Sequence, residues 1–158
     1  MLQIKLTQDK VAIVDDKDYE LISQHKWFAH RYKNKFYADA NFKEGNKYKT
    51  IRMHRIITGA GVGEEVDHIN GDTLDNRREN LRICTKTQNR QNRHYGYGSS
   101  SYKGVYWHKH SKKWCAQIRR STFIGYFDSE EEAARAYDKA AIDLFGEYAR
   151  LNFESEGK

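Results

Sequence analysis

Apolar and polar residues alternate along several short stretches in the first third of the chain. The run IKLTQDKVAIV alternates roughly, and WFAHRY and KFYADANF resemble two strands joined by a turn at 33–35. A period of two is typical of half-buried strands, so these stretches predict β-structure. After a turn at 44–46, YKTIRMHRII predicts a further strand over residues 48–57. The segment DDKDYELISQ is polar and then helical in its spacing.

The last third of the chain predicts three strands followed by one helix. The strand-like runs are GVYWHK, KWCAQIRR and TFIGYFD. Ser129 and Glu132 have the spacing of a capping box, and Gly146 is a natural helix stop. Spacings of three and four put one face of this helix at Ala133, Tyr137, Ala140 and Leu144.

These patterns predict an α+β protein made of consecutive modules. We expect a strand-rich segment at 1–53 that contacts DNA, a central module at 54–94, a linker at 95–101 and a strand–helix module at 102–153. The Gly-rich stretch GAGVGEE lacks the Lys-Ser/Thr pair of a phosphate-binding loop, so it is interpreted as a flexible connector.

Charge is distributed unevenly and points to nucleic acid. The chain carries a net charge of +6, but residues 80–127 hold ten basic residues and no acidic one. Residues 1–79 hold 14 basic and 13 acidic residues, and residues 128–158 hold four and nine. Tyr, Trp, Asn, Gln and Ser are interspersed with the bases, which is typical of a folded surface that meets phosphates.

Length and composition exclude several classes of protein. With 158 residues the chain suits one domain or two small ones, and 21 aromatic residues argue against disorder. We find no apolar run of membrane-spanning length and no signal peptide, and the two cysteines form no metal motif. We therefore expect no membrane partner and a location in the cytoplasm of a bacterial or phage-infected cell.

The segment VDHINGDTLDNRRENLRICTKTQNRQNR carries the candidate chemistry. Asp67 and His68 are adjacent on a short predicted strand, which a second strand over residues 81–85 can pair with. A helix then starts at the capping box Thr85–Gln88, with Asn89 one turn inside it. The Asp67 carboxylate and the Asn89 amide oxygen suit a hard divalent cation, and His68 can take a proton from an attacking water. These residue types can together hydrolyse a phosphodiester.

The run MHRII…VDHINGDTLDNRRENLRICTKTQNRQN resembles the HNH homing endonucleases of phages and mobile introns, whose active site is a ββα-metal motif. The resemblance implies that His68 activates water, that Asp67 and Asn89 bind the metal, and that Asn80 braces the hairpin. Asn89 stands where many members have histidine, which favours Mg²⁺ (or Mn²⁺) over zinc. The implied product carries a 5′-phosphate and a 3′-hydroxyl.

Several basic residues near this motif are candidates for phosphate contacts. Arg77 either touches a phosphate or braces the loop, and both alternatives stay open. His54 is a third ionisable candidate, for which a structural role is favoured. The further candidate phosphate contacts are Arg82, Arg90 and Arg93.

Residues 101–153 resemble the Apetala-type (ethylene-response-factor) DNA-binding domain. The shared features are the KGV start, the W-x-A-x-I strand, the GYFDSEEEAARAYDKAA run and the terminal LNF. The resemblance implies three antiparallel strands on one helix, with the sheet in the major groove of DNA. Trp114, Ala116 and Ile118 would then face the helix. The expected outward-facing DNA contacts are Lys103, Tyr106, His108, Gln117 and Arg119.

Three functions compete at this point. The first is a site-recognising, metal-dependent endonuclease that acts on double-stranded DNA, as a monomer or homodimer. The second is a non-catalytic, sequence-specific DNA-binding regulator. The third is an RNA-binding protein, which we disfavour because the deep, narrow major groove of A-form RNA does not admit the sheet.

Overall fold

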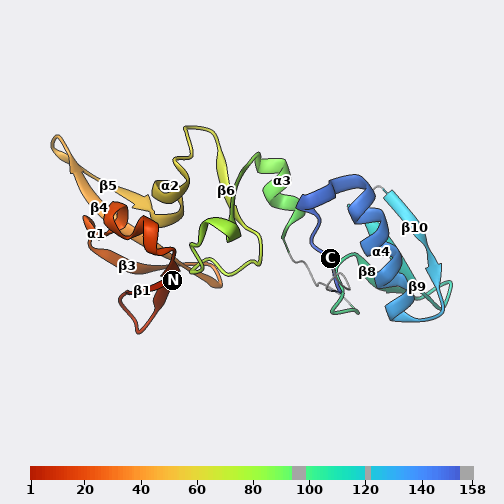
Figure 1. The fold of residues 1–158 in the computed structure, drawn as a ribbon. Coiled ribbons are helices and arrows are strands. Elements are labelled where there is room, and N and C mark those ends of the chain that lie inside the picture. The colour runs from red at the N-terminus through yellow and green to blue at the C-terminus, as the bar shows by residue number, and fades with distance from the viewer. Residues whose placement is uncertain (94–98, 120–121, 154–158) are drawn as a thin grey trace. The chain divides into compact units, whose positions relative to one another are not determined.

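The computed structural model describes residues 1–93, 99–119 and 122–153, and it consists of two compact units (Figure 1). Met1–Asn89 form the first unit and Arg90–Lys158 the second. Both units contain strands and helices, so the predicted α+β class is confirmed. The predicted boundary at 53/54 lies inside the first unit, and most of the predicted linker 95–101 lies outside the described residues.

The first unit contains three small antiparallel sheets, with strand orders β1-β2, β3-β4-β5 and β6-β7. The strands are β1 Leu2–Lys5, β2 Val11–Val14, β3 Trp27–Tyr32, β4 Lys35–Glu44, β5 Lys47–Arg52, β6 Glu65–His68 and β7 Leu81–Cys84. The helical elements are η1 Asp16–Asp18, α1 Tyr19–Ser23, α2 Met53–Thr58 and η2 Arg78–Asn80. Helix α3, Lys86–Gln91, follows β7 directly.

One hydrophobic core joins the N-terminal strands to the β6–β7 hairpin. Its buried side chains come from β2, α1, β4, α2, β6 and β7: Ala12, Val14, Ile22, Ala38, Met53, Ile57, Val66 and Leu81. The backbone reinforces this packing, because Ile13 N donates to Leu74 O at 2.9 Å and Asn76 N donates to Ile13 O at 2.7 Å. The strand-rich N-terminal segment is therefore part of the scaffold of the hairpin.

The sequence predicts one strand over residues 48–57, and this prediction is wrong for residues 53–57. Strand β5 ends at Arg52, and the next six residues form α2. Met53 and Ile57 are four residues apart and both are buried, which is the spacing of a helix face. Gly59, at φ +68°, ends the helix and its N–H donates to Arg55 O at 2.9 Å. Alternation alone did not reveal α2, since its contacts with β4, β6 and β7 are tertiary.

The Gly-rich segment after α2 is a connector, as expected, and one side chain organises it. The Arg55 guanidinium donates to the carbonyl oxygens of Ala60, Gly61 and Glu64 at 2.7–3.0 Å. Gly61 N also donates to Glu64 Oε2 at 2.7 Å. These bonds satisfy backbone groups that no helix or sheet pairs, so the connector holds a defined path into β6.

The second unit is a three-stranded antiparallel sheet covered by one helix, as the sequence predicts (Figure 1). Helix α4 packs against all three strands, whose order is β10-β9-β8. The elements are β8 Val105–His108, β9 Lys113–Ile118, β10 Thr122–Phe127, α4 Glu130–Phe145 and η3 Gly146–Tyr148. The predicted capping box is present, with Ser129 Oγ accepting from Glu132 N. None of the described helices is long and apolar enough to cross a membrane.

The buried face of α4 differs from the predicted one at its last position. Ala133 and Tyr137 are buried as expected, and Ala140 is half-buried. Leu144, however, is 56% exposed, because the last turn of the helix packs Phe145 against the core instead. Trp114, Ala116 and Ile118 contribute to this core, so their predicted orientation toward the helix is confirmed.

Gly104 should be indispensable for the second unit, because the backbone there has φ +76° and packs closely. A Cβ at this position would lie 2.1 Å from Tyr137 Cδ2 and 2.7 Å from Gln117 O. We expect Gly104→Ala to lower the free energy of unfolding by about 3 kcal/mol or more. Urea titrations that follow Trp107 and Trp114 fluorescence, in a Trp27→Phe background, measure the change.

Gly146→Ala is the matched control for this experiment. Gly146 also has positive φ, at +54°, but no atom lies within 4 Å of a Cβ built there. The backbone there, at φ 54° and ψ −130°, lies outside the left-handed helical region, so its replacement should cost only backbone strain, about 1–3 kcal/mol. Equal losses in the two variants would contradict the role of the Gly104–Tyr137 packing.

Candidate functional site

The β6–β7 hairpin carries a polar face and an apolar face. Glu65 and Asp67 lie two residues apart on β6, so both side chains project from one face. Their cross-strand partners on β7 are Cys84 and Arg82. The opposite face contributes Val66 and Leu81 to the hydrophobic core. The hairpin therefore presents two carboxylates on a rigid, anchored support.

Asp67 is buried and paired with a guanidinium. Arg82 donates to Asp67 Oδ2 from both Nε, at 3.0 Å, and Nη2, at 2.8 Å. Asp67 is only 5% exposed, and a nearby cation offsets the cost of burying its charge. Arg82 is thus engaged at the hairpin in this structure, and its predicted contact with a phosphate stays a prediction.

Helix α3 starts where the sequence predicts and brings Asn89 to the polar face. The Thr85–Gln88 capping box is formed, with Thr85 N donating to Gln88 Oε1 at 2.8 Å and Gln88 N to Thr85 Oγ1 at 3.3 Å. One turn later, Asn89 Nδ2 donates to Glu65 Oε2 at 2.6 Å. Glu65 is therefore a member of the site that sequence reasoning missed.

His68 ends β6 in a buried cluster of rings. Its ring centroid lies 5.0 Å from that of His54 and 6.4 Å from that of Tyr37. Burial lowers the pKa of His68 to about 4, although hydrogen bonding with the Asn76 side chain and the nearby Asp67 charge act to raise it. The imidazole is consequently neutral at neutral pH.

His54 is a second buried, neutral histidine. Burial is the main cause that lowers the pKa of His54 to about 2, followed by the charges of His68, Arg52 and Arg55. Its ring packs edge-on against both His68 and Tyr37. These contacts agree with the structural role that the sequence favours for His54.

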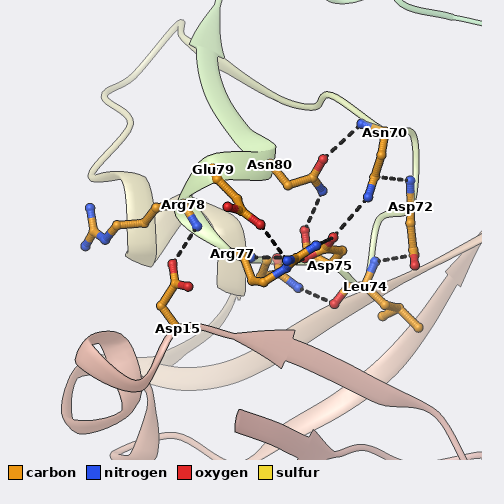
Figure 2. A network of polar contacts seen from close by, with 10 residues as sticks. Asp15, Asn70, Asp72, Leu74, Asp75, Arg77, Arg78, Glu79 and Asn80 are labelled. Atoms are coloured by element: carbon orange, nitrogen blue, oxygen red, sulfur yellow. Dashed lines mark hydrogen bonds and ion pairs between the residues drawn. The ribbon is translucent and has the colours of Figure 1, made fainter. Parts of the chain in front are cut away.

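A polar network organises the loop that connects β6 to β7 (Figure 2). Asn70 N donates to Asn80 Oδ1 at 2.9 Å, and Asn80 Nδ2 donates to Asp75 O at 2.8 Å. Asn80 thus makes bracing contacts across the hairpin, whereas a direct part in catalysis stays a prediction. Nearby, Arg78 N donates to Asp15 Oδ2 at 2.8 Å, which ties the loop to the N-terminal segment.

Arg77 makes bracing contacts within the same network. Its guanidinium donates to Asp75 Oδ1 at 2.8 Å and Oδ2 at 2.7 Å, and to Glu79 Oε1 at 2.5 Å. The Arg77 side chain holds the pKa of the buried Asp75 carboxyl below its usual value. The structure therefore shows the loop-bracing alternative for Arg77, and a phosphate contact stays a prediction.

The donor atoms on the polar face suit a hard cation. The Asp67 and Glu65 carboxylates and the Asn89 amide provide oxygen, which Mg²⁺ and Mn²⁺ prefer. Burial, with the charges of Asp67 and Glu65, raises the pKa of the Cys84 thiol to about 11, so no thiolate is offered at neutral pH. Among the described residues, no group of three or more His, Cys, Asp and Glu side chains is arranged to hold a metal ion.

The predicted DNA-facing residues of the second unit fall into two groups. Arg90 and Arg93 are exposed, in α3 and just after it. Tyr106, His108 and Gln117 project from the sheet face opposite α4, where Tyr106 Oη donates to Gln117 Oε1 at 3.2 Å. Tyr126 is an exposed aromatic side chain on the same face, and its ring centroid lies 5.1 Å from that of His108.

The other two predicted DNA contacts, Lys103 and Arg119, interact with residues of the second unit itself. Lys103 is buried, and its ammonium donates to the Gln91 carbonyl. Burial lowers the pKa of Lys103 to about 8. Arg119 follows β9 and its guanidinium lies over the Phe145 ring of α4 at 5.1 Å. DNA contacts by these two side chains stay predictions that their observed positions do not support.

Sequence reasoning could have found Glu65 from its spacing. Glu65 lies two residues before Asp67 on a strand, so period two already puts both carboxylates on one face. No spacing rule, in contrast, links Glu65 to Asn89, which is 24 residues away. That contact depends on how the hairpin and α3 fold together.

Comparisons with known proteins agree with this division of the chain. Residues 53–91 match the family model described as HNH endonuclease, and residues 100–147 match the family model described as AP2 domain. Both family predictions are therefore confirmed: the chain combines an HNH endonuclease-type segment with a C-terminal AP2 domain. The HNH match supports a nuclease, and the AP2 match supports DNA binding.

Individual relatives cover only parts of the chain. The ethylene-responsive transcription factor WRI1 of Arabidopsis thaliana is 34% identical over 93 residues, which cover 52% of this chain and 22% of that protein. APETALA2-like protein 2 of Oryza sativa subsp. indica is 43% identical over 70 residues, covering 41% and 16%. A solved structure described as "DNA binding and cleavage by the HNH homing endonuclease I-HmuI" is 30% identical, with a TM-score of 0.36 and coverage of 45% and 44%.

The buried His54 should make the stability of the first unit depend on pH. In the unfolded chain His54 protonates near the ordinary histidine pKa of 6.5, whereas the folded chain keeps it neutral down to a pKa of about 2. Between these values the unfolded state binds more protons, so the free energy of unfolding falls as pH falls. We expect His54 to account for about 2 kcal/mol of loss between pH 7 and pH 5.

Urea titrations with a chelator at pH 5 and pH 7 test this expectation. Trp27 fluorescence reports on the first unit if Trp107 and Trp114 are replaced by Phe. His54→Phe keeps an aromatic ring and should remove the His54 share of the pH dependence. An unchanged difference between the two pH values in His54→Phe would contradict the assignment.

Proposed function

We propose that this protein is a divalent-metal-dependent endonuclease that hydrolyses phosphodiester bonds in double-stranded DNA at a recognised site. The observation that carries the proposal is the combination of two oxygen donors on one face of the hairpin, Asp67 and Asn89, with a neutral His68 at the end of the same strand. The match of residues 53–91 to HNH endonucleases supports the same chemistry.

His68 is the proposed general base. A base must be unprotonated to accept a proton from water, and the lowered pKa of His68 keeps it in that form at neutral pH. The bonds between Asn80, Asn70 and Asp75 hold the loop that follows His68. The apolar face of the hairpin holds β6 itself, so the base is built on a rigid support.

Asp67 and Asn89 are the proposed metal-binding residues, with Mg²⁺ or Mn²⁺ as the cation. When bound, the cation supplies stabilisation of the negative charge that develops on the phosphate and leaving-group oxygens. Arg82 is paired with Asp67, so we also propose that its guanidinium contacts a phosphate bound at this site. One such site cuts one strand, so a double-strand break requires a second engagement.

The second unit is proposed to position the cut. The sheet face of Tyr106, His108 and Gln117 is opposite the helix, and a sheet of this kind can enter the major groove. Residues 80–127 carry ten basic and no acidic residues, which suits a polyanion. We also propose that the strand-rich N-terminal segment contacts DNA.

His68→Ala should abolish nicking while leaving DNA binding intact. Loss of a general base typically costs about 10²–10⁴ in rate. Relaxation of a supercoiled plasmid with Mg²⁺ measures nicking, and a gel shift measures binding. His25→Gln replaces a histidine whose ring packs edge-on against Trp27; it is the control and should cut normally. Undiminished nicking by His68→Ala would contradict the assignment of His68 as the general base.

Asp67→Asn tests the metal-binding role of Asp67. It keeps the shape of the side chain but removes the charge, so metal-dependent nicking should be lost. A wild-type chain that shifts DNA but never nicks it, with either Mg²⁺ or Mn²⁺, would instead favour the non-catalytic regulator.

The affinity for DNA should fall steeply with salt, because it depends on displaced counterions. Arg90→Gln and Arg93→Gln should each reduce the slope of log K against log salt by about 1 if these exposed side chains contact phosphates. Fluorescence anisotropy of a labelled duplex between 50 and 200 mM KCl, roughly the range over which such effects are large, measures the slope. Lys139→Gln, on the exposed side of α4, is the control and should leave the slope unchanged.

A further inference from the structure

We propose that Glu65 is a positioning residue for Asn89, whose amide it orients so that the carbonyl oxygen is presented to the cation. This inference rests on the proposed function, because it takes Asn89 as a metal-binding residue. Its basis is one short hydrogen bond between β6 and helix α3, in which no residue is buried.

The contact determines which way the Asn89 amide points. Asn89 Nδ2 donates to Glu65 Oε2 at 2.6 Å. An ionised carboxylate only accepts hydrogen bonds, so it selects the NH₂ group of the amide over the carbonyl. Once the NH₂ group faces Glu65, the carbonyl oxygen lies on the other branch of the amide. That oxygen is the atom that a hard cation uses.

Helix α3 needs such a contact because hydrophobic packing does not anchor it. The helix is six residues long, and none of its residues is buried. An isolated helix of this length is unstable in water. Its start is held by the Thr85–Gln88 capping box, but that cap acts on the backbone at the first turn. The bond from Glu65 is what holds the Asn89 side chain against β6.

The strand places Glu65 where it can act on Asn89 and Asp67 at once. Glu65 and Asp67 share the polar face of β6. On the same face, Cys84 of β7 lies opposite Glu65 and Arg82 lies opposite Asp67. Asp67 is oriented by Arg82 and Asn89 by Glu65, so each proposed metal-binding residue has its own partner. Loss of such a partner commonly weakens metal binding by about 10–100-fold.

Binding of Mn²⁺ to the full chain, measured by the EPR signal of the free ion, tests the proposal without using activity. We expect Glu65→Ala to weaken Mn²⁺ binding by about 10-fold. Because Glu65 acts through Asn89, the double variant Glu65→Ala/Asn89→Ala should bind no more weakly than Asn89→Ala. Losses that add in the double variant would overturn the positioning role and make Glu65 an independent contributor.

The Asn89 side chain offers a second, direct measurement. In the folded chain its NH₂ protons should have widely separated NMR shifts, because only one of them bonds to the carboxylate. Glu65→Ala should collapse that separation, while Glu65→Gln, whose side-chain oxygen can still accept, should retain most of it and most of the Mn²⁺ affinity. An Asn89 signal that is unchanged in Glu65→Ala would contradict the proposal.

Two controls separate this proposal from other causes. Glu79→Ala removes an exposed carboxylate of the same unit, which pairs with Arg77, and should leave Mn²⁺ binding unchanged. A loss in Glu79→Ala equal to that in Glu65→Ala would show a general charge effect and overturn the proposal. If Asn89→Ala binds Mn²⁺ normally, the proposed metal site itself fails, and the role of Glu65 toward it fails as well. Urea titration of each variant checks that the first unit is folded.

Discussion

The β6–β7 hairpin is too short to be stable by itself, and the rest of the first unit supplies the packing that it lacks. Strands β6 and β7 have four residues each, and an isolated two-stranded hairpin is marginal in water. Val66 and Leu81 therefore pack into a core supplied by β2, α1, β4 and α2. Backbone bonds from Ile13 to the loop at 74–76 add a second attachment. The strands that precede the β6–β7 hairpin therefore hold the candidate site in place.

Charge is arranged differently on the two sides of this hairpin. On the polar face the buried Asp67 carboxylate is paired with the Arg82 guanidinium. Around His68 the protein instead buries two imidazoles in contact, and burial keeps both neutral. In the proposed function, Asp67 would bind the metal and the unprotonated His68 would accept a proton from water.

Much of this organisation could be predicted from local pattern. The capping boxes at Thr85 and Ser129 were readable because they depend on residues three apart, and both are formed. The strand–helix layout of the second unit followed from periods of two and 3.6. Helix α2 was missed because Ile56 and Ile57 suit a strand as well as a helix, and its buried face is defined only by distant strands. Lys103 was predicted at the DNA surface from its position in the Apetala-type resemblance and Arg82 from its charge, yet both are engaged inside the protein.

The sequence by itself predicted the two families and the order of the modules. It also offered Asp67, His68, Asn80 and Asn89 as candidate site residues, through residue type, short spacing and the family resemblance. Tertiary structure alone decided which side chains support them. Glu65 meets Asn89, and Arg78 meets Asp15, across 24 and 63 residues of chain. Periodicity predicts the face on which a side chain lies, but not its partner on another element. Partners are set by how the elements pack, because a hydrogen bond requires two groups to approach within about 3 Å.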